Sequence, residues 1–156
     1  MRRVEKLNDN QIEAFMKFEG VSVLLNSEYE QVTETTALYK DSIDDLVNAF
    51  EMDSREGFAG CKDSMAKLLR LNYLALGLGE SGEVQGKVKK IIRDKNGVLG
   101  DDDRKEILKE VGDLFYYMTQ LLIELDSDIN VVRTENGFKL LSRLMRGAIK
   151  GSGDNR

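Results

Sequence analysis

Two pairs of acidic residues in the middle of the sequence have the chemistry and spacing of metal ligands. The first acidic pair is Glu80-Ser-Gly-Glu83 and the second acidic pair is Glu110-Val-Gly-Asp113. On a helix, side chains three residues apart lie on one face, about one turn from each other. Four carboxylates brought together would raise one another's pKa values unless a cation lies between them. Because oxygen ligands suit hard cations, the two pairs predict an Mg²⁺ or Mn²⁺ site inside a helical bundle.

Other polar side chains share helical faces with the acids or form a stripe of their own. Tyr117 lies one turn beyond Asp113, so its hydroxyl could reach a ligand that the acids hold. Lys87 shares the face of the first acidic pair, and Lys90 lies near its margin. A third stripe, further along the chain, has amide and basic side chains: Asn136, Lys139 and Arg143. Two acidic faces and one basic face together indicate a ligand that carries both metal and phosphate.

The alternative interpretation of each acidic pair taken alone is a solvated helix face, where charged residues at this spacing are common. Two features favour a metal site for the two pairs together. Strongly apolar segments and four glycines surround the first pair, namely Gly77, Gly79, Gly82 and Gly86. Each glycine costs about 1 kcal/mol in a helix, so such a cluster indicates close approach of a ligand or another helix. Two like charges in one pair also destabilise a helix slightly without a cation.

The composition excludes several classes of protein. The 156 residues contain no histidine, which excludes Ser-His-Asp and Cys-His catalysis and histidine-ligated zinc. Cys61 is the single cysteine, so the chain has no internal disulfide, and a reducing, cytoplasmic setting is expected. A net charge of −5 argues against binding to nucleic acid. No signal peptide and no membrane-spanning run of about 18 apolar residues is expected.

The elements that position these residues are all predicted to be helices, because the chain has no proline and its apolar residues follow helical spacing. A loop with an Asn96-Gly97 turn separates the segments that contain the two acidic pairs. The expected helices cover about residues 8–25, 28–50, 61–95, 103–125 and 128–146.

The sequence resembles the MazG-like all-α nucleoside triphosphate pyrophosphohydrolases. The signature of that family is Glu-x-x-Glu followed, after a gap, by Glu-x-x-Asp, as in the two acidic pairs here. The neighbouring segments are similar as well: Leu76-Gly-Leu-Gly-Glu-Ser-Gly-Glu-Val84, Lys89-Lys90, Glu110-Val-Gly-Asp-Leu-Phe-Tyr-Tyr117 and Asn136-Gly-Phe-Lys-Leu-Leu-Ser-Arg143. The resemblance covers about residues 71–146.

The resemblance implies a four-helix core, commonly completed by dimerisation, that hydrolyses a nucleoside triphosphate to a monophosphate and pyrophosphate. The core is expected at 61–150, with 1–60 as an N-terminal helical extension of the same domain and 151–156 as a mobile tail. Glu80, Glu83, Glu110 and Asp113 would bind Mg²⁺ or Mn²⁺, and Glu80 or Glu83 would accept the proton of the attacking water. The residues that match phosphate-binding or sugar-binding positions are Lys90, Tyr117, Asn136, Lys139 and Arg143.

Several alternatives stay open on the sequence alone. A phosphoribosyl-ATP pyrophosphohydrolase would keep the fold and the reaction but change the substrate. A non-catalytic helical dimer could bind a nucleotide or a protein partner as a regulator. A structural bundle with a solvated acidic face would bind no metal, and its melting temperature would not respond to Mg²⁺. The preferred base, the number of metal ions and the choice between a dimer and a tetramer are not specified by the sequence.

Overall fold

The structure is a computed structural model that describes residues 4–17, 24–53 and 62–146. In these ranges the chain forms helices and no strand, which confirms the all-α prediction. Cys61 and the expected tail at 151–156 lie outside the described residues. The elements are α1 (Asp9–Met16), α2 (Asn26–Thr35), α3 (Tyr39–Asp53), α4 (Lys62–Gly77), the 3₁₀ turn η1 (Leu78–Glu80), α5 (Ser81–Asp94), α6 (Asp101–Glu124) and α7 (Ile129–Met145).

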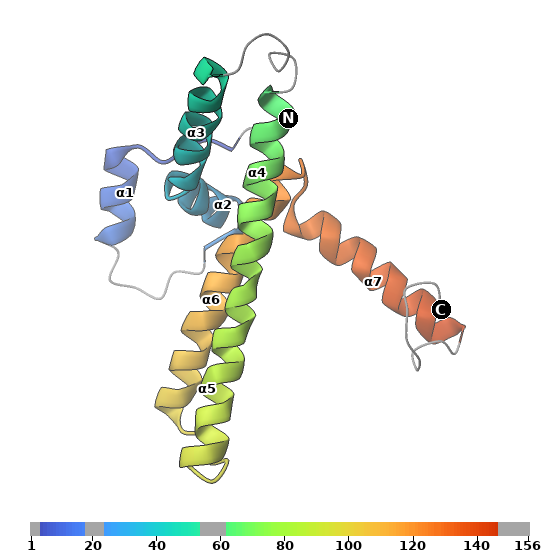
Figure 1. The fold of residues 1–156 in the computed structure, drawn as a ribbon. Helices are drawn as coiled ribbons and strands as arrows, with labels where there is room; N and C mark the ends of the chain where they lie inside the picture. The colour runs from blue at the N-terminus through green and yellow to red at the C-terminus, as the bar shows by residue number, and fades with distance from the viewer. Residues whose placement is uncertain (1–3, 18–23, 54–61, 147–156) are drawn as a thin grey trace.

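A long antiparallel hairpin forms the centre of the molecule. One arm is the rod of α4, η1 and α5, and the other arm is α6, which runs back beside it (Figure 1). Ion pairs join the arms in reverse order along the chain: Lys95 with Asp103 at 2.7 Å, Lys87 with Glu110 at 3.1 Å, and Arg70 with Glu124 at 3.2 Å. This order fixes which residues of the two arms lie at the same level.

The predicted helix over 61–95 is interrupted at the first acidic pair. The rod continues through this point, but Leu78–Glu80 tightens into a 3₁₀ turn between α4 and α5. Gly77 and Gly79 flank Leu78, and glycine backbone adapts to such local changes at little steric cost. The predicted turn at the end of the rod is confirmed, because Asn96 and Gly97 have φ values of 50° and 76°.

The single helix predicted over 28–50 was wrong, because α2 ends at Thr35 and α3 begins at Tyr39. The threonine-rich end of α2 provides the reason. The hydroxyl of Thr35 donates to the carbonyl oxygen of Gln31 at 2.7 Å, and that of Thr36 donates to Val32 at 3.2 Å. β-Branched side chains with such bonds weaken a helix without any glycine or proline to mark the break.

Two further boundaries differ from the expectation. α1 ends at Met16 instead of near residue 25, and Leu24 and Leu25 are not helical. α6 begins at Asp101, two residues earlier than predicted, so three aspartates occupy its first turn, where the helix dipole favours negative charge. Asp128 caps α7, because its carboxylate accepts from the backbone N–H groups of Asn130 and Val131.

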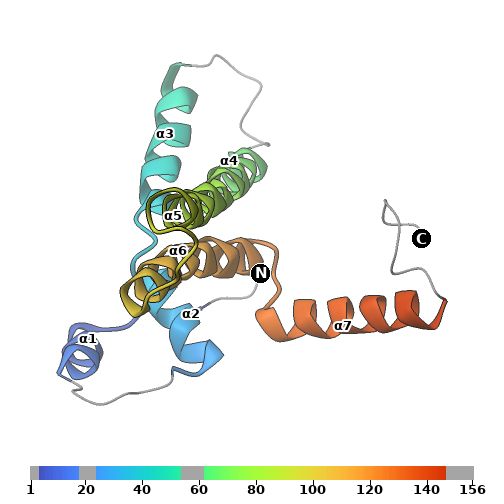
Figure 2. The same ribbon diagram turned by 90° about the horizontal axis from the view of Figure 1, so that it is seen from below.

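The apolar core is small and lies where α3, α4 and α6 meet. Ala37, Tyr39 and Leu74 are buried there, and the side chains around them are Ile43, Tyr117 and Leu121. Large apolar side chains stay exposed elsewhere, most of all on α7, which diverges from the hairpin (Figures 1 and 2). Phe138 is 70% exposed and Met145 is 87% exposed. Exposed apolar area on this scale is typical of surfaces that bind a partner.

Candidate metal and phosphate site

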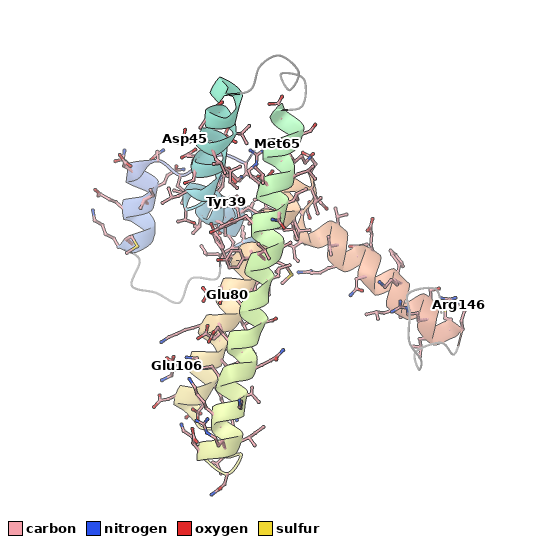
Figure 3. The ribbon with its side chains drawn as sticks, in the orientation of Figure 1. Tyr39, Asp45, Met65, Glu80, Glu106 and Arg146 are labelled. Atoms are coloured by element: carbon pink, nitrogen blue, oxygen red, sulfur yellow. The ribbon has the colours of Figure 1, made fainter. Side chains whose placement is uncertain are left out.

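The hairpin brings the two acidic pairs to the same level. Lys87 contacts Glu110 across the hairpin, Glu83 precedes Lys87 by one turn, and Asp113 follows Glu110 by about one turn. Because the two arms are antiparallel, Glu83 and Asp113 therefore lie opposite each other. Figure 3 shows Glu80 at the middle of the rod, where α6 runs beside it. Glu80 and Glu110 are partly buried, whereas Glu83 and Asp113 are exposed.

Tyr117 lies one turn beyond Asp113 on α6, at the level of Gly77 and close to Glu80 and Asp113, one member of each acidic pair. Burial is the main cause that raises the pKa of its hydroxyl, and nearby Tyr73, Glu80 and Asp113 raise it further. The carboxylates of Glu80 and Asp113 raise it because a phenolate would be a third negative charge beside them. The hydroxyl therefore stays protonated near neutral pH and can donate a hydrogen bond to an anionic ligand at this level.

The ring of Tyr117 also explains one of the glycines at the first acidic pair. A Cβ atom added at Gly77 would overlap the ring of Tyr117, so only glycine lets α4 approach α6 this closely. At Gly79, Gly82 and Gly86 an added Cβ would meet no described atom within 4 Å beyond its own helix. Close packing within the chain therefore accounts for Gly77 alone among these four.

Replacing Gly77 by alanine should destabilise the protein, whereas the same change at Gly82 should stabilise it. Alanine gains up to about 1 kcal/mol of helix propensity at either position. At Gly77 the displaced tyrosine ring should cost about 1–3 kcal/mol, which exceeds that gain. Urea denaturation of both variants measures the difference, and a Gly77→Ala protein as stable as the Gly82→Ala protein would contradict the packing.

The donor chemistry of the two pairs fits a hard divalent cation, but the carboxylates are not gathered around one point. In the described part of the chain, no group of three or more Asp, Glu or Cys side chains stands ready to hold a metal ion. Repulsion between like charges favours such a spread arrangement when no cation lies between them. The Lys87 ammonium group also contacts Glu110 at 3.1 Å, on the face that would hold the ion.

The predicted basic stripe on α7 is not brought to the acids within one chain. Asn136, Lys139 and Arg143 do lie on one helix, but α7 packs against neither α5 nor α6 along its length (Figures 1 and 2). Lys90 is exposed on α5, two turns beyond Glu83. A single protomer therefore places Lys87, Lys90 and Tyr117 near the acids, and the α7 side chains elsewhere.

The sequence interpretation missed Tyr29 of α2. Asp113 raises the pKa of the Tyr29 hydroxyl, after the larger effect of burial, so this side chain lies close to the second acidic pair. It forms part of the wall of a small cavity of about 50 Å³ between α2 and α6, together with Phe115 and Thr119. No local signal in the sequence marks Tyr29, because the packing of α2 against α6 brings it there.

A separate cavity of about 430 Å³ lies between α3 and α4, away from the acidic pairs. Its wall includes Asp44, Lys67 and Arg70. Both cations already have acidic partners: Arg70 contacts Asp44 at 2.8 Å, and Lys67 contacts Asp126 at 3.5 Å. The Arg70–Asp44 pair joins α4 to α3, and the Lys67–Asp126 pair joins α4 to the turn after α6, so both cations have a structural role in the fold.

Gln120, three residues beyond Tyr117 on α6, also has a structural role. Its side chain is completely buried, accepts a hydrogen bond from the Tyr39 hydroxyl at 3.1 Å and donates one to the Thr33 hydroxyl at 3.0 Å. This chain of bonds ties α2 and α3 to α6. Gln120 therefore does not extend the candidate site beyond Tyr117.

Comparisons with known proteins give one informative relationship. The Gene 37 protein of Mycobacterium phage L5 is 48% identical to this chain over 87 residues, which cover 55% of this chain and 76% of that protein. No family model and no solved structure matches the sequence. None of the described helices is both long enough and apolar enough to cross a membrane.

Proposed function

Since the chain belongs to the same family as the Gene 37 protein of Mycobacterium phage L5, whose name states no activity, we propose its function from its own residues. The protein is an Mg²⁺-dependent nucleoside triphosphate pyrophosphohydrolase that converts a (d)NTP and water to a (d)NMP and pyrophosphate. The observation that carries this proposal is the placement of both acidic pairs at one level of the hairpin, with Tyr117 one turn further along and close to Glu80 and Asp113. The resemblance of residues 71–146 to the MazG-like enzymes supports the same reaction.

The side chains at this level have complementary tasks in such a reaction. Glu80, Glu83, Glu110 and Asp113 would hold the metal, and Mn²⁺ could replace Mg²⁺ because both prefer oxygen ligands. A bound Mg²⁺ would neutralise phosphate charge and lower the pKa of the attacking water. Glu80 or Glu83 would accept the proton of that water, which a carboxylate can do without any histidine. Phosphoryl transfer depends on positioning and charge neutralisation, so no covalent nucleophile is required.

The remaining contacts to the nucleotide would come from donors and cations. The Tyr117 hydroxyl and the exposed Lys90 ammonium group can bind phosphate or sugar oxygens from the hairpin itself. Asn136, Lys139 and Arg143 can contribute only from another protomer or after a movement of α7, because α7 diverges from the hairpin in this structure. The proposal therefore includes a homodimer, or a tetramer of two dimers, that completes the site.

Product analysis of the full chain tests the reaction. The purified protein is incubated with each (d)NTP and with phosphoribosyl-ATP, in Mg²⁺ and in EDTA, and the products are resolved by ion-exchange chromatography. We expect a monophosphate and pyrophosphate in Mg²⁺ and no turnover in EDTA. Activity restricted to phosphoribosyl-ATP would identify the protein as a phosphoribosyl-ATP pyrophosphohydrolase. No Mg²⁺-dependent pyrophosphate from any substrate would reject the enzyme.

A non-catalytic nucleotide-binding dimer is the second candidate, and the contact of Lys87 with Glu110 favours it, since that contact occupies one predicted ligand. Such a regulator would bind nucleotide without cleaving it. Equilibrium dialysis with labelled nucleotide, run beside the product analysis, separates the two functions. Binding with no pyrophosphate over many hours would support the regulator.

Self-association should depend on the apolar side chains of α7. Phe138 is 70% exposed in one protomer, and Phe138→Asp places a charge at this position of the apolar surface. We expect sedimentation equilibrium to show a shift from dimer to monomer. Val98→Asp is the matched control, because Val98 is 69% exposed in the loop at the tip of the hairpin. A Phe138→Asp protein that sediments like the unmodified dimer would show that α7 is not the interface.

A further inference from the structure

The ammonium group of Lys87 is shared between two carboxylates of α6. It lies 3.1 Å from an oxygen of Glu106 and 3.1 Å from an oxygen of Glu110. Glu106 and Glu110 are one turn apart on α6. The Lys87 side chain is 27% exposed and that of Glu110 is 18% exposed, so the contact with Glu110 is partly shielded from water. The Lys87 ammonium group is therefore fixed by two ion pairs beside a predicted metal ligand.

We propose that Lys87 is an internal counter-ion that neutralises Glu110 until a divalent cation displaces it, and that Glu106 then keeps the displaced ammonium group. This inference rests on the proposed metal site. Two residues outside the set of ligands would then change the metal affinity. Lys87 competes with the metal for Glu110, and Glu106 weakens this competition because it also binds the Lys87 ammonium group.

The contacts of Glu106 explain why it can act as the acceptor. One of its oxygens contacts Lys87 at 3.1 Å, and the other contacts Lys109 at 2.6 Å. Lys109 lies three residues along the same helix, so this second contact holds the Glu106 carboxylate at its position on α6. When Glu110 turns toward a cation, Lys87 keeps one of its two partners and is not left as an uncompensated charge.

The arrangement also explains why the acids are spread apart in the structure. Without a cation, the four carboxylates repel each other, and the Lys87 ammonium group contacts only Glu110 among them. Lys87 neutralises Glu110 on its Glu106 side, away from the level of Asp113. Closing the site therefore requires the exchange of one cation for another at Glu110.

Opposite changes in metal affinity are expected when the two halves of the Lys87–Glu106 pair are removed. Lys87→Met removes the competitor and should tighten metal binding. Glu106→Gln leaves Lys87 with Glu110 as its remaining carboxylate partner and should weaken metal binding. If the pair merely held α5 against α6, both variants would loosen the same contact and would change the affinity in the same direction.

The experiment is Mn²⁺ binding to the full chain without nucleotide, followed by electron paramagnetic resonance of the unbound ion. We expect Lys87→Met to lower the Kd up to about fivefold, the range set by a partly exposed ion pair. Lys109→Met is the matched control, since it removes the same charge from a contact with Glu106 but not with Glu110. Lys109→Met should change the Kd less than Lys87→Met does. Thermal melting in EDTA shows whether each variant is folded.

The outcomes separate this inference from the function on which it rests. If the unmodified protein binds no Mn²⁺, the metal site and this inference are both rejected. If it binds Mn²⁺ but Lys87→Met and Lys109→Met change the Kd equally, the effect is general electrostatics and the role of Lys87 is overturned. If Lys87→Met and Glu106→Gln both weaken binding, the pair is structural and the proposal is likewise overturned.

Discussion

Replacing Glu83 by glutamine is expected to reduce Mg²⁺-dependent pyrophosphate release by about 10²–10⁴-fold, the usual contribution of a positioned general base. Glutamine keeps the shape of the side chain but loses the negative charge that would hold a metal and accept a proton. Initial rates of pyrophosphate release with a saturating nucleotide measure the effect. A rate within a factor of a few of the unmodified protein would remove Glu83 from the site.

The same substitution should leave the metal-free protein as stable as before or slightly more stable. Glu83 is exposed and lies three residues from Glu80 on the same face, so the change removes a repulsion between like charges. Loss of activity without loss of stability distinguishes a functional carboxylate from a structural one. Asp102→Asn is the control: its side chain is 97% exposed in the first turn of α6, and its rate should not change.

Replacing Arg70 by methionine should destabilise the fold by about 3–5 kcal/mol, because it leaves a buried carboxylate without its main partner. Glu124, at the end of α6, is 1% exposed. The Arg70 Nε atom donates to one oxygen of Glu124 at 3.2 Å and lies 3.2 Å from the other. That second oxygen has no hydrogen-bond partner, and Lys40 is 3.5 Å from it. Urea denaturation at one fixed protein concentration measures the loss, because self-association would otherwise change the apparent stability.

Two companion variants show whether the buried charge is the cause. Lys67→Met breaks an exposed pair with Asp126 at 3.5 Å and should cost at most about 1 kcal/mol. The double variant Arg70→Met/Glu124→Leu removes both buried charges and should recover much of the stability lost in the single variant. A double variant as unstable as the single one would show that Arg70 acts through its aliphatic packing instead.

The chemistry of the candidate site is visible in the sequence because it depends on local spacing. Residues three apart share a helix face wherever that helix lies, so Glu110, Asp113 and Tyr117 could be grouped before any packing was known. The missing histidine and the single cysteine also limit the chemistry without reference to the fold. The threonine-rich break after α2 was not predicted, since weak local preferences decided it and no glycine or proline marked it.

Contacts between distant residues could not be read in this way. The sequence allows Lys87 to pair with Glu83 on its own helix or with any acid across the hairpin, and the register of α6 selects Glu106 and Glu110. The buried Gln120 and Glu124 likewise look like surface residues in the sequence, but the arrival of α2, α3 and α4 on α6 buries them. Tyr29 reaches Asp113 for the same reason.

The sequence by itself therefore determined the helical class, indicated a candidate set of acidic ligands, and excluded the reactions that require histidine. Only the tertiary structure decided that the two acidic pairs lie at one level, that Lys87 contacts Glu110 and that α7 diverges from the acids. The physical reason is that helix periodicity relates neighbours within one helix, whereas the register between helices comes from side-chain packing and ion pairs along the whole hairpin. A shift of one residue in that register would turn a different face of α6 toward the rod and separate the acidic pairs.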